Sequence, residues 1–231
     1  RSALGLGRLD DATTIAVRAV VVAALSFSIE PVDWCAELLR TEGAVGLDEL
    51  HLLYAGASHS SFLGSNLEEA VVLGRRGLEL ALTSDRMDAH TCAALVGLQV
   101  GLVFSGRVDE YLELNHRFAQ LDADTMLQFR LSEVFGLAML KRFDEAQALS
   151  DEVLPAARRL DVPSAKCLAE YGCGLAYASS DPDRALHALR RAFESASSGR
   201  CTMYEGGVLR ELARLEASHG SPEAALAFFE R

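Results

Sequence analysis

The sequence is poor in lysine and in net positive charge. Its 231 residues include 22 Lys or Arg and 33 Asp or Glu, which gives a formal net charge of −11, and only Lys141 and Lys166 are lysines. An acidic surface repels phosphate backbones and anionic lipid surfaces. We therefore expect no direct contact with nucleic acid and no association with a membrane.

A long apolar run is also missing. The most apolar stretch, 19–25, is far shorter than the roughly 20 residues that a membrane-spanning helix needs, so we interpret it as part of a buried helix. The cysteines are odd in number and scattered over apolar segments, which is typical of buried thiols in a reducing cytoplasm; they are Cys35, Cys92, Cys167, Cys173 and Cys201.

Signatures of catalysis and of cofactor binding are absent. Neither lysine follows a glycine, as the lysine of a phosphate-binding loop must, and no Gly-x-Ser-x-Gly nucleophile motif is present. His90 and Cys92 are the closest approach to a metal-binding pair, but no second pair lies nearby. We expect no enzyme activity, no cofactor and no metal site.

No segment alternates between apolar and polar residues as a half-buried strand does, so the sequence predicts an all-α fold. Apolar periodicity, Gly/Ser/Pro turns and acidic first turns predict paired helices. The pairs are 12–27 with 32–40, 49–62 with 67–82, 88–104 with 108–121, 126–140 with 143–160, 165–179 with 183–196, and 206–218 with 223 onward. We expect Pro31 to open the second helix, a polar break at 122–125 and a loop closed by Pro163.

The second helices of five pairs start in the same way. An apolar residue or proline comes first, acidic side chains usually follow in the first turn, and a fourth residue is expected to pack inward. These fourth residues are Ala70, Tyr111, Ala146, Ala185 and Ala225, at intervals of 41, 35, 39 and 40 residues. The spacing is slightly longer than the tetratricopeptide (TPR) period of about 34. It predicts a right-handed α-solenoid of about five to six TPR-like hairpins.

No Pro-rich or Ser-rich linker marks a boundary, so we expect one repeat domain over 1–231. Because the chain begins with Arg1 and ends within an expected helix, we also expect it to be a fragment of a larger protein. Two motifs fit helix packing. Gly172-x-Gly174 predicts a close helix crossing, and Cys167 and Cys173 fall on different faces of one helix.

In TPR-like arrays the first helices line a concave groove. Counting back from the aligned residues predicts groove-facing aromatic and charged side chains at His59, Phe62, Gln128, Phe135, Glu170, Tyr177, Arg210 and Arg214. Such a groove suits a peptide or a small-molecule effector, although aromatic residues at helical spacing are often plain core. The arginine pairs 75–76, 158–159 and 190–191 lie in second helices. We interpret them as solvated surface paired with carboxylates, with a docking site as the alternative.

Three segments, 154–160, 174–185 and 209–226, resemble the helical-repeat region of actinobacterial signalling ATPases, including LuxR-type transcriptional regulators of the MalT-like kind. The resemblance implies an ATPase domain before the repeats and a DNA-binding domain after them. In some relatives a cyclase domain is attached instead. It also implies that the repeats sense or hold an effector.

These observations favour a sensory and protein-interaction module of a LuxR-family regulator, acting through a protein or peptide partner or a small-molecule effector. Two alternatives are a structural protein–protein adaptor and the helical tail of a cyclase-type enzyme. Homo-oligomerisation is left open.

Overall fold

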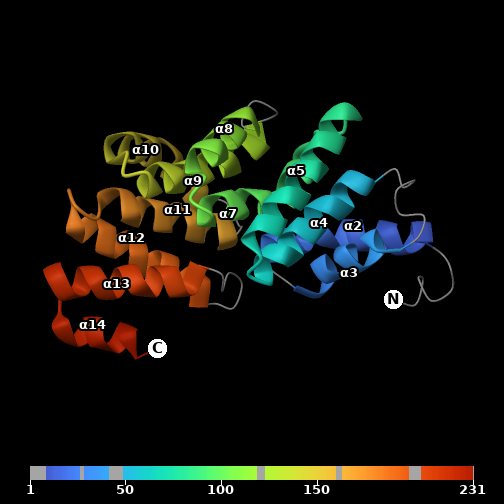
Figure 1. Ribbon diagram of the computed structural model, residues 1–231. Coiled ribbons are helices and arrows are strands. Elements are labelled where there is room, and N and C mark those ends of the chain that lie inside the picture. The colour runs from blue at the N-terminus through green and yellow to red at the C-terminus, as the bar shows by residue number, and fades with distance from the viewer. Residues whose placement is uncertain are drawn as a thin grey trace. The chain divides into compact units, whose positions relative to one another are not determined.

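The computed structural model describes residues 9–26, 29–41, 49–118, 123–159, 163–197 and 204–230. All regular structure in these ranges is helical, with no strand among them, which confirms the all-α prediction (Figure 1). None of the helices in these ranges combines the length and apolar character needed to cross a bilayer.

The chain divides into two compact units, Arg1–Tyr111 and Leu112–Arg231, so the boundary falls inside one helix, α8 (Val108–Phe118). The prediction of a single repeat domain stays a prediction. The helices of the first unit are α2 (Leu9–Ser26), α3 (Ile29–Leu39), α4 (Leu50–Leu63), α5 (Leu67–Thr83), α6 (Ala89–Ala94) and α7 (Val96–Phe104). In this unit α3 packs on α4, and α4 forms a hairpin with α5 that α7 covers.

The second unit contains three hairpins that follow one another in chain order, coloured from yellow to red in Figure 1. They are α9 (Ala123–Met139) with α10 (Phe143–Arg159), α11 (Pro163–Tyr177) with α12 (Pro182–Ser195), and α13 (Glu205–His219) with α14 (Pro222–Phe229). Each is joined to the next because α11 packs on both α9 and α10, and α13 packs on α12.

The predicted inward-packing position is confirmed in all five second helices. The residues at that position are all nearly inaccessible to solvent, and they are Ala70, Tyr111, Ala146, Ala185 and Ala225. Each N–H bonds to the carbonyl oxygen four residues earlier, in the first turn of its helix. The repeat that carries Tyr111 in place of alanine therefore keeps the same register.

Three of the hairpin turns have one geometry. Ser65, Gly106 and Lys141 adopt positive φ angles of 63°, 79° and 61°. In each turn the N–H of the next residue bonds back to a carbonyl five residues earlier, at 2.8 to 2.9 Å. This arrangement is the Schellman closure of a helix, which favours glycine because glycine meets no Cβ penalty there. Only one of the three turns has glycine at that position.

Several predicted helix limits were wrong by two or three residues. Helix α2 begins at Leu9, three residues before the predicted start at 12. Helix α3 begins at Ile29, ahead of Pro31, and α11 begins at Pro163, which was expected to close a loop. Proline fits the first helical turn because its missing N–H has no intrahelical partner there.

The polar break predicted at 122–125 was also wrong over its described part, because α9 begins at Ala123. Short polar residues are common in the first turn of a helix, so polarity alone does not mark a loop. The predicted helix 88–104 is divided at Leu95, which lies between the end of α6 at Ala94 and the start of α7 at Val96. Asp88 begins this segment as predicted, since its carboxylate accepts the N–H of Thr91 at 2.8 Å.

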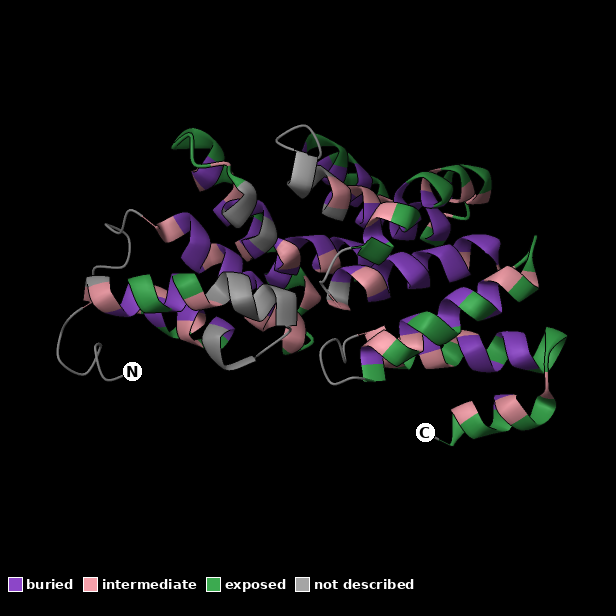
Figure 2. Cartoon of the chain, turned by 180° about the vertical axis from the view of Figure 1, so that it is seen from behind, coloured by how far each residue is buried: buried purple, intermediate pink, exposed green. Residues whose placement is uncertain are grey.

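The first helices of the hairpins form the interior layer. Among the residues whose side chains are described, α4 and α11 have no exposed residue, and α9 has only Met139. Second helices alternate between buried and exposed positions, as Figure 2 shows. A ligand therefore has little access to α4, α9 and α11, whereas α2 exposes Thr14, Ile15 and Arg18, and α13 exposes Arg210 and Arg214.

Candidate functional site

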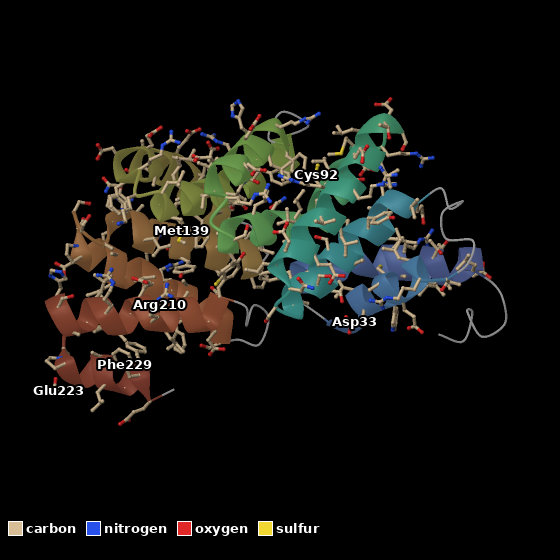
Figure 3. All side chains as sticks on the ribbon, in the orientation of Figure 1. Asp33, Cys92, Met139, Arg210, Glu223 and Phe229 are labelled. Carbon is tan, nitrogen blue, oxygen red and sulfur yellow. The ribbon has the colours of Figure 1, made fainter. Side chains whose placement is uncertain are left out.

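Among the predicted groove residues whose side chains are described, the two that are fully exposed lie on α13. The guanidinium groups of Arg210 and Arg214 are one helical turn apart, and their side chains are 70% and 54% exposed. Glu211 lies between them and accepts from the Nε atoms of both, at 3.2 and 2.9 Å. One carboxylate thus pairs with two exposed guanidinium groups. Figure 3 labels Arg210 on α13.

Aromatic rings lie beside this cluster. The ring of Tyr171 in α11 is 5.4 Å from that of Phe135 in α9 and 6.2 Å from that of Tyr204, which precedes α13. A Cβ at Gly207 would lie 2.7 Å from the Tyr171 hydroxyl, so glycine allows this ring to approach α13. Burial raises the pKa of Tyr171 to about 12, against the opposing positive charge of Arg210.

Tyr171 and Tyr204 were missed by the sequence analysis. Tyr171 was overlooked because it follows Glu170, the residue that helical counting placed on the groove side. Tyr204 immediately precedes α13, two residues before the start predicted for that helix at 206, so it fell outside the helical count. Phe135, which was predicted, is buried under these rings.

Arginine side chains from two second helices bind the carboxylate of Glu170. Its buried carboxylate accepts from Arg158 in α10, at 2.8 and 3.1 Å, and from Arg191 in α12, at 2.8 Å. Both arginine side chains are roughly half exposed. The carboxylate therefore links two consecutive hairpins of this unit.

Tyr177 also contacts second helices. Its hydroxyl donates to Asp151 in α10 at 2.9 Å, and the guanidinium of Arg184 lies 3.7 Å from its ring centroid. Arg184 in turn pairs with Asp151. Burial and the hydrogen bond to Asp151 raise the pKa of Tyr177 to about 12.

In the first unit, His59 is fully buried and Phe62 is partly exposed. A Cβ at Gly97 would collide with the backbone of His59, so α4 and α7 cross closely there. Burial lowers the pKa of His59 to about 4. The Phe62 ring lies 5.7 Å from that of Phe104 at the end of α7. Gln128 lies in α9, with its side chain outside the described residues.

The close helix crossing predicted at Gly172-x-Gly174 and the placement of Cys167 and Cys173 on different faces are confirmed. A Cβ at Gly174 would lie 2.5 Å from the Leu189 Cγ, and one at Gly172 would lie 3.1 Å from the Val134 Cγ1. Cys167 donates to the Ala192 carbonyl in α12, whereas Cys173 faces Ser150 in α10. The four described cysteines, Cys35, Cys92, Cys167 and Cys173, are buried and none is in a disulfide, and Cys201 lies outside the described residues.

Arginines of the second helices are paired with carboxylates, which confirms the surface interpretation for Arg75, Arg76, Arg158, Arg190 and Arg191. Within the described ranges, no three His, Cys, Asp or Glu side chains are placed to hold a metal ion. The arrangement on α13 can bind an anionic group through two exposed arginines.

A scan of protein families finds no matching family, and a search of curated proteins finds no match either. Among solved structures, the chain is similar to the crystal structure of BtubC (BKLC) from P. vanneervenii. The TM-score is 0.56 at 18% sequence identity, and the match covers 93% of this chain and 89% of that one. The two proteins therefore share a fold.

Proposed function

We propose that the chain is a non-enzymatic protein-interaction module built as a right-handed α-solenoid of about five to six TPR-like hairpins. Support comes from hairpins that follow one another in chain order within each unit and from the common buried position of the second helices. The likeness to the BtubC structure extends over most of both chains, so the all-helical fold is shared. Repeat arrays of this kind present surfaces for partner recognition.

The observation that carries the proposal is the exposed arginine pair on α13. Among the predicted groove-lining residues whose side chains are described, Arg210 and Arg214 are exposed and Phe62 is partly exposed. Arginine binds carboxylates with a planar, two-pronged geometry, and the partly exposed ring of Tyr204, just before α13, can add apolar contact area. The partner is a protein or peptide segment that carries Asp or Glu beside an apolar residue.

The context we propose is a multidomain bacterial regulator of the LuxR type, in which partner or effector binding regulates attached ATPase and DNA-binding domains. This context rests on the resemblance of 154–160, 174–185 and 209–226 alone. Binding at α13 would then favour one arrangement of the attached domains over another, by as much as its differential affinity for the two.

A selection from a displayed peptide library tests the interaction surface. The purified chain should enrich peptides rich in Asp and Glu, and the double variant R210E/R214E should lose them by about tenfold or more. The matched control is R75E/R76E, which reverses an exposed arginine pair on α5 and should retain binding. No enrichment, or equal loss in both variants, contradicts the proposal.

The regulator context has its own test. In the protein that carries this chain, R210E/R214E should uncouple addition of a selected peptide from ATPase activity and from DNA binding, whereas R75E/R76E should not. A response that is identical in both variants counts against the regulatory role, and a stable partner with no such response favours the adaptor alternative.

A further inference from the structure

Three consecutive helices of the second unit meet in two charged clusters. Helix α11 packs between α10 and α12 (Figure 1), and each of the three helices contributes one residue to each cluster. The two residues that a helix contributes are seven positions apart, so they lie two turns apart on the same side of that helix. The first cluster is Asp151, Tyr177 and Arg184, and the second is Arg158, Glu170 and Arg191.

The charges of the first cluster are balanced. The guanidinium of Arg184 pairs with the carboxylate of Asp151 and lies 3.7 Å from the ring centroid of Tyr177. The Tyr177 hydroxyl donates to the same carboxylate at 2.9 Å. One arginine meets one carboxylate, so this cluster joins the three helices without an excess of positive charge.

The second cluster has two arginines for one carboxylate. The Nε atoms of Arg158 and Arg191 donate to the same oxygen of Glu170, Oε1, each at 2.8 Å, and the Nη2 atom of Arg158 donates to Oε2 at 3.1 Å. The Glu170 side chain is only 3% exposed, whereas those of Arg158 and Arg191 are 42% and 46% exposed. A buried carboxylate therefore fixes two guanidinium groups next to each other at the surface.

Most of the hydrogen-bond donors of these two arginines remain available. A guanidinium carries five N–H groups in a rigid plane. Glu170 accepts two from Arg158 and one from Arg191, and no other group among the described residues accepts from either arginine. The remaining N–H groups belong to half-exposed side chains, so an acceptor from outside the chain can reach them.

The surroundings of the cluster add positive charge. Lys166 lies one turn before Glu170 on the same side of α11 and is half-buried. The nearest acidic residue along α12 is Glu194, which is exposed and lies one turn after Arg191. Three cationic side chains therefore face two carboxylates, on a chain whose formal net charge is −11.

We propose that Arg158 and Arg191 bind a phosphate group between α10 and α12, with Glu170 as the residue that positions them. Two adjacent guanidinium groups offer donors in more than one plane, which suits a tetrahedral group with several acceptor oxygens. A carboxylate is already satisfied by the two-pronged contact of one arginine. The phosphate is either the free ion or a phosphomonoester carried by a partner. None of these residues belongs to the α13 surface, so the inference does not depend on the proposed function.

Titration of the chain with inorganic phosphate at neutral pH tests the site. The Nε–H NMR signals of Arg158 and Arg191 should shift and saturate, because the phosphate withdraws electron density through their remaining N–H groups. Sodium acetate at equal ionic strength should shift the two signals far less. An equal response to acetate, or a similar shift of every arginine signal, overturns the inference.

Single variants separate binding from a purely structural role. R191Q should weaken phosphate binding by about tenfold, while Arg158 still pairs with Glu170 and the chain stays folded. K166Q removes a charge that makes no contact with Glu170 among the described interactions, and it should weaken binding by about threefold. Circular dichroism and urea unfolding establish that each variant is folded. Unchanged phosphate affinity in both variants contradicts the site.

The matched control is R184Q, which breaks the other cluster that joins the same three helices. It should reduce phosphate affinity much less than R191Q does. Equal loss in the two variants would show that binding follows the general packing of the helices, and it overturns the inference. R210E/R214E should not weaken phosphate binding, so a failure of this site and a failure of the α13 surface are distinguishable.

A phosphoserine peptide and its serine counterpart distinguish the two sources of the phosphate group. Tighter binding of the phosphopeptide than of inorganic phosphate supports the site with a phosphorylated partner. Equal affinity supports the site with the free ion. Binding of the serine peptide as tight as that of the phosphopeptide contradicts recognition of phosphate.

Discussion

Glu170 shows how a charged residue predicted to face a ligand can instead hold hairpins together. A buried carboxylate needs compensation for lost hydration, and here the guanidinium groups of Arg158 and Arg191 provide it from two different helices. Helical counting predicted that Glu170 of α11 faces a groove, whereas the structure buries it between helices. It could not show that long arginines on neighbouring helices reach that position.

Replacing Glu170 with glutamine should destabilise the chain by about 1–2 kcal/mol, because the amide keeps the volume but loses the charge that satisfies both arginines. Urea unfolding at neutral pH measures the change. Glu152→Gln is the control, since it breaks the exposed pair with Arg130 and should cost much less. A larger loss of stability in Glu152→Gln than in Glu170→Gln would contradict the role of Glu170 in linking the hairpins.

The burial of His59 makes the stability of the chain depend on pH. Its folded-state pKa is about 4, below the ordinary 6.5, so the unfolded chain binds a proton more readily between these values. Stability from this residue is complete above pH 6.5 and is lost as the pH falls toward 4. Burial and the charge of Arg86 lower the pKa of His51 too, which adds a change of the same sign.

The variant His59→Gln should therefore have a shallower pH dependence than wild type. Between pH 7 and pH 5 the free energy of unfolding of wild type should fall by about 2 kcal/mol more than that of the variant. Urea titrations at the two pH values measure this. Parallel curves would show that His59 is protonated equally in both states.

At the scale of the helix, the hairpins could be predicted more reliably than the crossings between them. Five aligned second helices were found because acidic first turns and a small fourth residue repeat along the chain. The break at Leu95 was missed because it lies in a continuous apolar stretch with no turn signal. The crossing of α4 and α7 at Gly97 requires tertiary contacts that the sequence does not display.

Two helical glycines should respond in opposite directions to alanine. Gly97→Ala places a Cβ against the backbone of His59 and should cost about 3 kcal/mol or more, as overpacking of a tight crossing does. Gly206→Ala meets nothing within 4 Å and should stabilise α13 by about 0.5 kcal/mol through helix propensity. Thermal and urea unfolding report both. A neutral Gly97→Ala would mean that the helices can separate without cost.

At the scale of the whole molecule, the sequence predicted the fold class but not the distribution of accessible surface. Four of the eight predicted groove residues, His59, Phe135, Glu170 and Tyr177, are buried among other helices, while Arg210 and Arg214 are exposed. Counting repeat positions assigns the same solvent exposure to equivalent residues of every hairpin. Their actual exposure depends on whether another hairpin packs against them. No linker in the sequence marks the division into two units at Tyr111 either.

Binding at the exposed arginines is the central claim, and hydrogen exchange of the chain saturated with a selected acidic peptide tests it most directly. Amides of α13, over 205–219, should exchange more slowly in the complex because the peptide lies across Arg210 and Arg214. Exchange in α5 and α14 should be unchanged. Slowing confined to α14 or to the second helices, or no slowing anywhere, would contradict the account.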